Sequence, residues 1–146
     1  MPARALSPAQ RTFVADARRA TLATLDPAGR PRLVPICFVL DPESDVLYTP
    51  LDDKPKRSDD PMRLARVRDI AERPAVGVLV DRWDEDWSRL AWVRLDGEAR
   101  LIDAHEAPAG TIDALRGKYP QYASHRLEDR PLIAVSILGA TSWSAR

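Results

Sequence analysis

Three cationic side chains that stand close together in the sequence, Lys54, Lys56 and Arg57, indicate a binding site for an anion. They follow a strand-like run that ends in Tyr48 and Thr49. Lysine and arginine are the side chains with which proteins hold phosphate and carboxylate groups most effectively. Because the whole chain balances 22 Lys and Arg against 22 Asp and Glu, this positive charge is local. The expected ligand is a small phosphorylated or polyanionic molecule, and the alternative is a solvated loop neutralised by nearby aspartates.

The composition of the chain also indicates which classes of partner it is not expected to bind. The chain has 146 residues, which predicts one domain over 1–146, and its zero formal charge argues against a nucleic acid partner. No apolar run approaches the roughly 20 residues of a membrane span, so no membrane partner is expected. The single cysteine, Cys37, excludes an internal disulfide and favours a cytoplasmic location. His105 and His125 stand far apart and outside any ligand-spaced motif, so no metal site is predicted.

The hydrophobic pattern predicts a mainly β chain with peripheral helices. Strands are expected at 20–25, 33–40, 46–49, 75–80, 90–102 and 132–143, and helices at 8–18, 61–72 and 107–118. Ser7-Pro8 and Asp60-Pro61 each combine an N-cap side chain with a following proline, which is typical of a helix start. Tight turns between most strands favour an antiparallel barrel over regular βαβ units.

Three of these elements also show which side should face the core. The run 33–40 is almost wholly apolar, so we expect it to be buried on both faces. The run 90–102 alternates apolar and charged residues, which predicts one buried and one exposed face. On the helix at 61–72, the residues expected to face the core are Leu64, Val67, Ile70 and Ala71.

The chain also resembles a known family. Short motifs follow one another in the order Ala-Thr-Leu-Ala-Thr at 20–24, Gly29-x-Pro31, Pro35, Tyr48-Thr49, the cations at 54–57, Arg73-Pro74-Ala75-Val76 and Gly97-Glu98-Ala99-Arg100. Their order and spacing resemble the pyridoxamine 5′-phosphate oxidase-like split β-barrel flavoproteins. The resemblance implies a six-stranded antiparallel split barrel. It also implies a homodimer that binds FMN, or the deazaflavin coenzyme F420, in a groove between the subunits.

The resemblance implies roles for particular residues. Tyr48 and Thr49 would lie along the cofactor, and Lys54 or Lys56 would hold its phosphate. Backbone groups of the second strand would line the ring system, at Val34, Pro35, Ile36 and Cys37. Trp92 stands where the FMN oxidases carry a glutamine on the long strand. No proton donor is identified, so no catalytic residue is assigned.

Departures from the FMN oxidases favour the deazaflavin. Those enzymes carry an Arg and a Lys on the second strand that reach the FMN phosphate, whereas the matching residues here are Leu33 and Phe38. Arg32 is one place away, so it would point to the opposite face of the strand. The deazaflavin ends in a lactyl-oligoglutamate tail, and its anionic groups would meet the cations Lys54, Lys56, Arg57, Arg63 and Arg66. The segment 81–89 resembles a deazaflavin-using subgroup, and the Ala-, Arg-, Asp- and Pro-rich composition favours an actinobacterial source.

The resemblance therefore implies an F420-dependent oxidoreductase that transfers a hydride to a conjugated or quinone-like organic acceptor. One alternative is an FMN-dependent oxidase or reductase of the pyridoxamine phosphate oxidase type. A second is a non-catalytic flavin or deazaflavin carrier. The cluster of Trp83, Trp87 and Trp92 indicates an interface or a ligand wall, with Trp87 expected at a dimer contact and Trp92 either among the cofactor-binding residues or in the barrel core.

Overall fold

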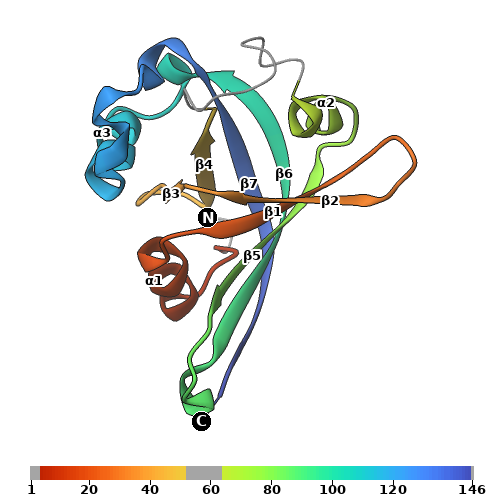
Figure 1. Ribbon diagram of the computed structural model, residues 1–146, viewed down its shortest axis with the longest axis vertical. Coiled ribbons are helices and arrows are strands. Elements are labelled where there is room, and N and C mark those ends of the chain that lie inside the picture. Colours follow the sequence, from red (N-terminus) through yellow and green to blue (C-terminus); the bar gives the residue numbers. More distant parts are fainter. Residues whose placement is uncertain (1–3, 52–63, 146) are drawn as a thin grey trace.

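The strands form one antiparallel sheet that curls around a core (Figure 1). The computed structural model describes residues 4–51 and 64–145. Within them the strand order is β2-β1-β5-β6-β7-β4-β3. The strands are β1 (Ala20–Leu25), β2 (Pro31–Ile36), β3 (Val39–Leu40), β4 (Val46–Pro50), β5 (Ala75–Arg82), β6 (Ala91–Asp103) and β7 (Pro131–Ser144). β2 and β3 stand at opposite ends of this order although only Cys37 and Phe38 separate them, so the two edges of the sheet must come close together.

Helices surround the sheet, which confirms the prediction of a mainly β fold with peripheral helices. The α-helices are α1 (Pro8–Asp16), α2 (Ala65–Glu72) and α3 (Thr111–Lys118). The 3-10 helices are η2 (Trp87–Arg89), η3 (Ala104–Glu106), η4 (Pro120–Ser124) and η5 (Leu127–Asp129). α1 and α2 pack against the same group of buried residues, to which Val14 and Val67 belong, whereas α3 packs against a different group through Leu115. No helix in the described ranges is long and apolar enough to cross a membrane.

The described residues contain seven strands, so the prediction of six was wrong. The expected strand 33–40 is two strands, because β2 pairs with β1 whereas β3 pairs with β4. The chain changes partners at Cys37 and Phe38, where the Phe38 N–H donates to the Tyr119 hydroxyl at 3.1 Å. Tyr119 directly follows α3, so nothing within 33–40 could reveal this break.

The expectation that 33–40 is buried on both faces was also wrong. The Leu33 side chain is 66% exposed and Pro35 is exposed, while Ile36 is buried. β2 stands at the end of the strand order and pairs only with β1. Within the described ranges no second layer covers its outer face, so its apolar side chains form surface there.

β6 and β7 are the longest strands and pair with each other along nearly their whole length. The predicted alternation of β6 is confirmed, since alternate residues are buried and the charged residues between them are exposed. At Gly97 the register shifts, and an added Cβ would meet the Ser136 carbonyl oxygen at 2.6 Å and the Val135 side chain at 2.9 Å. Glycine therefore permits the close approach of the two strands at this point.

Two of the helix predictions are confirmed at one end and corrected at the other: α1 begins at Pro8 as expected but ends at Asp16 rather than at 18, and α3 ends at Lys118 as expected. The Ser7 hydroxyl accepts the Gln10 N–H at 3.1 Å, which confirms the predicted N-cap of α1. α3 begins at Thr111 rather than at 107, because Pro108 and a left-handed Gly110 (φ 91°) precede it. The predicted start of α2 at Asp60-Pro61 lies outside the described residues.

The buried face of α2 differs in part from the prediction. Val67 and Ile70 are buried as expected, and Leu64 packs against the same core. Ala71 is exposed instead, and Asp69 takes an interior position with 2% of its surface exposed. A buried carboxylate needs partners, and those of Asp69 come from β1 and β2.

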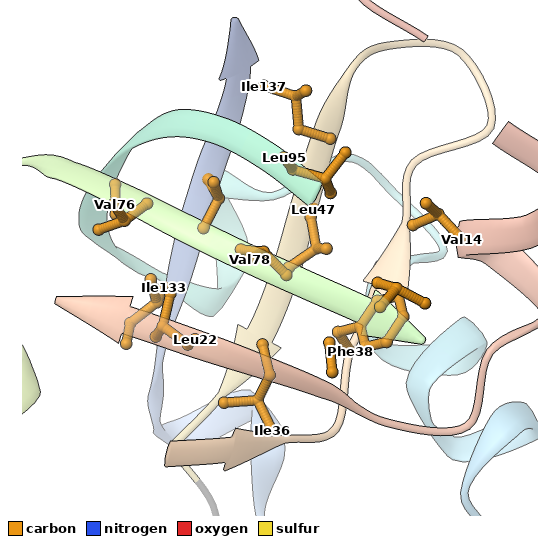
Figure 2. Packing of buried hydrophobic residues seen from close by; sticks show 14 of the residues in the cluster. Val14, Leu22, Ile36, Phe38, Leu47, Val76, Val78, Leu95, Ile133 and Ile137 are labelled. Carbon is orange, nitrogen blue, oxygen red and sulfur yellow. The ribbon is translucent and has the colours of Figure 1, made fainter. Parts of the chain in front are cut away.

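The core consists of two clusters on opposite faces of the sheet. Side chains from different strands point into the first cluster, among them Leu22, Leu47 and Ile133 (Figure 2). The second cluster contains Tyr48 from β4 and Leu115 from α3. Leu47 and Tyr48 are adjacent on one strand, so they point to opposite faces and each joins a different cluster.

Candidate functional site

The end of β4 positions the first two predicted cofactor contacts. Tyr48 and Thr49 are both buried, Tyr48 in the second cluster and Thr49 on the opposite face. Burial raises the pKa of the Tyr48 phenol, with Asp41 adding to this effect and Arg100 opposing it, so the phenol is neutral at physiological pH. The ring of Tyr48 is largely occupied by core contacts, and its contact with a cofactor stays a prediction.

A hollow of about 380 Å³ lies beside the end of β4. It is lined by Val67, Ile70, Ala71, Pro74, Ala99, Arg100, Leu101 and Ile133. Ile133 of β7 pairs with Thr49 of β4 on one side and with Leu101 of β6 on the other. Thr49 is therefore on the strand next to the lining residue Ile133. The hollow has an apolar floor with one guanidinium among its lining residues, which suits a flat apolar group that carries negative charge.

The residues that flank the predicted cations in the sequence both contact the core. Leu51, which precedes them, is buried in the first cluster, and Leu64, which follows them, packs against the same cluster. Lys54, Lys56, Arg57 and Arg63 lie outside the described residues. Arg66, in the first turn of α2, is half-buried. Their predicted contacts with phosphate and carboxylate groups stay predictions.

Arg100 is a candidate that sequence reasoning missed. It lies on the exposed face of β6, lines the hollow and influences the pKa of Tyr48 two strands away. Its pairing partner, Ala134, also pairs with Tyr48, so the three residues form one row across β6, β7 and β4. The alternation of 90–102 placed Arg100 among solvent-facing charges, and only the sheet order brings it beside Tyr48.

The predicted ring-lining segment of β2 has a free edge within the described residues. Val34 is half-buried against the core, Ile36 is buried, and Cys37 is half-buried where the strand ends. Because β2 pairs on one side only, backbone groups on its other edge have no strand partner among the described residues. Pro35 can contribute only its carbonyl oxygen there. The segment can thus offer backbone groups to a ligand, as the resemblance implies.

Trp92 lies far from these groups within one chain. It is eight residues from Arg100 along β6, a separation of roughly 25 Å in an extended strand. There it lines a second hollow of about 490 Å³ together with Phe13, Arg82 and Trp143. The chain therefore does not bring Trp92 together with Tyr48 and Thr49, and a shared site would require a second subunit.

Apolar side chains are exposed on the outer face of β2, β1 and β5. We call Leu25, Leu33, Pro35 and Leu79 the outer apolar face. Thr21 pairs with both Pro35 and Leu79, so these side chains are close neighbours across three strands. Apolar patches of this kind typically mark contact surfaces. Trp83 and Trp87, at the β5–β6 connection, are also about two-thirds exposed.

Asp103, His105 and Glu106 form an exposed cluster in which one possible ligand atom from each lies within 4.8 Å of the others. Sequence spacing had not singled out this cluster. The carboxylates of Asp103 and Glu106 form the capping box of η3, which accounts for their positions without an ion.

Comparison with known proteins places this geometry in a family. The family model described as pyridoxamine 5′-phosphate oxidase matches residues 6–144. No curated protein matches the chain in sequence.

Several solved structures have a similar fold. The conserved hypothetical protein Rv2991 from Mycobacterium tuberculosis aligns with a TM-score of 0.75 at 20% identity, covering 100% of this chain and 91% of that one. An F420 reductase aligns with a TM-score of 0.66 at 18% identity, covering 93% and 98%. The heme storage protein HutZ from Vibrio cholerae aligns with a TM-score of 0.65 at 14% identity, covering 97% and 95%. Sequence identities this low show only that the fold is shared. The family model matches almost the whole chain, so the chain belongs to the pyridoxamine 5′-phosphate oxidase family.

Proposed function

We propose that the protein is an oxidoreductase that binds the deazaflavin coenzyme F420 between two subunits and delivers its hydride to a conjugated or quinone-like acceptor. The observation that carries the proposal is that the two positions matching the FMN phosphate contacts of the second strand hold no cation. Leu33 and Phe38 stand where FMN oxidases carry the phosphate-binding Arg and Lys, and Phe38 is completely buried in the core. Arg32 donates its Nε–H to Asp69 at 2.9 Å on the other side of the strand.

The cations that remain suit a longer anionic ligand. Lys54, Lys56, Arg57 and Arg63 stand between β4 and α2 in the sequence, and Arg66 lies in the first turn of α2. Arg100 adds a guanidinium to the hollow beside the end of β4. These residues would hold the phosphate and tail carboxylates, while the apolar floor formed by Leu101, Ile133 and Val67 would contact the ring system.

When bound, the coenzyme would supply the hydride chemistry, and the residues of the chain would supply binding, orientation and exclusion of water. Backbone groups at Val34, Pro35 and Ile36 of β2, and at Cys37 just after it, would fix the orientation of the ring. Trp92 would come from a second subunit, because it lies at the far end of β6, and the outer apolar face would contact that subunit. We therefore infer a homodimer with two such grooves.

The proposal is tested by turnover and by affinity. Reduced coenzyme mixed with the protein and a quinone should be oxidised faster than without protein, as followed by absorbance. Lys54→Ala or Lys56→Ala should weaken coenzyme binding about tenfold or more, the loss expected for one charge-assisted contact. Arg19→Ala removes an exposed positive charge at the start of β1 and should change neither quantity. Tight binding without turnover would favour the non-catalytic carrier.

An FMN-dependent enzyme is the second candidate, since the family includes FMN-binding proteins. The exposed position of Leu33 provides its test, because a cation there can reach solvent or ligand without entering the core. Leu33→Arg should raise FMN affinity about tenfold if the missing cation is what disfavours FMN. An unchanged FMN affinity would remove this reason for preferring the deazaflavin. Phe38→Lys is not a usable test because Phe38 is fully buried.

A further inference from the structure

Three guanidinium groups surround a small hollow that the proposed function does not use. The hollow has a volume of about 250 Å³ and lies between the β1–β2 turn and α2. It is lined by Pro27, Arg32, Arg68, Asp69, Glu72 and Arg73. The side of α2 that lines it differs from the side that lines the hollow beside β4, where Val67, Ile70 and Ala71 lie.

A buried carboxylate fixes the first guanidinium. Arg32 donates from Nε to Asp69 Oδ2 at 2.9 Å, and the hydroxyl of Thr24 donates to the same oxygen at 2.7 Å. Burial raises the pKa of Asp69, but the bonds from Arg32 and Thr24, together with the charges of Arg32 and Arg73, lower it below its ordinary value, so Asp69 stays charged at neutral pH. This arrangement uses only the Nε–H of Arg32. Its two Nη groups make no hydrogen bond within the described ranges.

The second guanidinium is also held in place. Arg73 donates from Nε to the Leu25 carbonyl oxygen at 3.0 Å and from Nη1 to Glu72 at 3.1 Å. Its Nη2 has no partner among residues 4–51 and 64–145. The contact with the end of β1 therefore orients the Arg73 side chain. Its remaining N–H donors are available on the side of the hollow.

Arg68 leaves the hollow with uncompensated positive charge. Asp69 is paired with Arg32, and Glu72 is paired with Arg73. Arg68 is exposed and has no ion pair within the described part of the chain. The hydrogen bonds that join Asp69 to the strands explain why the Arg32 side chain points toward α2. It does not explain why a third, unpaired arginine shares the same hollow.

We propose that this hollow binds a compact oxyanion, the phosphate or carboxylate group of a small ligand, separately from the flavin groove. The planar donor forks of arginine match the oxygen spacing of both groups. Arg32 and Arg73 are fixed by contacts within the protein, so little side-chain freedom is lost when the ligand binds. Arg68 supplies the charge that the ligand neutralises.

Isothermal titration with inorganic phosphate and with acetate, at constant ionic strength, tests the proposal. Phosphate, acetate or both should bind the wild-type protein, and the stronger of the two identifies the ligand group. Arg68→Ala should weaken that binding about tenfold or more, and Arg68→Lys should restore it only in part because lysine lacks the fork. Arg19→Ala, with the same loss of charge elsewhere, should bind like the wild type.

The two sites are distinguished by testing the variants of each site for binding of the other site's ligand. Arg68→Ala should leave coenzyme affinity unchanged, and the double variant Lys54→Ala/Lys56→Ala should leave the Arg68-dependent anion binding unchanged. The proposal is overturned if neither anion binds the wild-type protein, or if Arg68→Ala binds the anion as tightly as the wild type. If the protein binds the anion but not the coenzyme, the proposed function is contradicted and the proposed anion site is not.

Discussion

The hydroxyl of Tyr119 joins the two backbone groups of Phe38 at the point where β2 gives way to β3. It accepts the Phe38 N–H at 3.1 Å and lies 3.2 Å from the Phe38 carbonyl oxygen. It also lies 2.9 Å from the Arg18 carbonyl oxygen, to which it can donate. One side chain from the end of α3 thus satisfies the backbone at the place where the sheet changes partners.

Removal of this hydroxyl should destabilise the fold. Tyr119→Phe leaves the buried Phe38 N–H without its acceptor, which should lower the free energy of unfolding by about 1–3 kcal/mol. Urea denaturation measures this loss. Tyr48→Phe is the matched control, because Tyr48 is buried but its hydroxyl makes no hydrogen bond within the described residues. Equal stability of the two variants would contradict the role assigned to Tyr119.

The Asp69 carboxylate should make the protein sensitive to acid. Its pKa in the fold lies below the ordinary 3.8, so its contribution is complete above that pH and is lost as the pH falls further. Asp69→Asn should cost about 1–3 kcal/mol of unfolding free energy at pH 7, and the difference from wild type should shrink below about pH 3. Denaturation curves at both pH values measure this, with the exposed Asp96→Asn as control. A difference that does not change with pH would exclude the charge of Asp69 as its cause.

Lys118 should be unusually reactive for a lysine. Burial lowers its pKa to about 8, and repulsion from Arg18 adds to the shift while Cys37 and Asp16 oppose it. The Phe38 ring, whose centroid lies 3.9 Å from Nζ, also favours the charged form and limits the shift. Acetylation of Lys118, followed by mass spectrometry, should therefore reach half its maximal rate near pH 8.

The same shift predicts a change of stability with pH. The unfolded chain keeps the Lys118 proton up to about pH 10.5, whereas the fold releases it near 8, so this residue makes the free energy of unfolding rise between these values. Lys118→Met should remove that rise, and Arg18→Ala should move the acetylation midpoint upward. A midpoint near 10.4 in the wild-type protein, the value of free lysine, would refute both expectations.

The outer apolar face should be a contact between subunits. Leu79 is exposed near the middle of this face, so Leu79→Arg would place a charge there and should convert a dimer into monomers of 16.3 kDa. Sedimentation equilibrium measures the mass. Glu43→Arg, in the exposed turn before β4, should leave the dimer intact. A wild-type protein that sediments as a monomer would contradict the shared groove itself.

The sequence predicted most clearly the elements whose signals are local. The bounds of β1 were predicted to the residue, and the N-cap of α1 and the alternation of β6 are confirmed. These features depend on side chains within a few positions of one another. The family was also recognisable, because its motifs follow one another along the chain in a fixed order.

Features that depend on distant partners could not be predicted. The break at Phe38 requires Tyr119, which stands 81 positions later. The burial of Asp69 requires Thr24 and Arg32, which belong to strands that precede it by 45 and 37 positions. Apolar content alone could not distinguish a strand inside the core from an edge strand with an exposed face, which is why β2 was placed wrongly.

Titration of the purified protein with coenzyme F420 and, separately, with FMN, followed by fluorescence, shows directly which cofactor the protein binds. We predict tighter binding of the coenzyme than of FMN, with coenzyme affinity reduced about tenfold or more in Lys54→Ala or Lys56→Ala. Under the proposed function, Leu33 and Phe38 would leave FMN without the phosphate contacts that the FMN oxidases make, while the cations at 54–57 would hold the longer anionic tail. Tighter binding of FMN than of the coenzyme, or equal affinity of the wild type and both lysine variants for the coenzyme, would contradict the account.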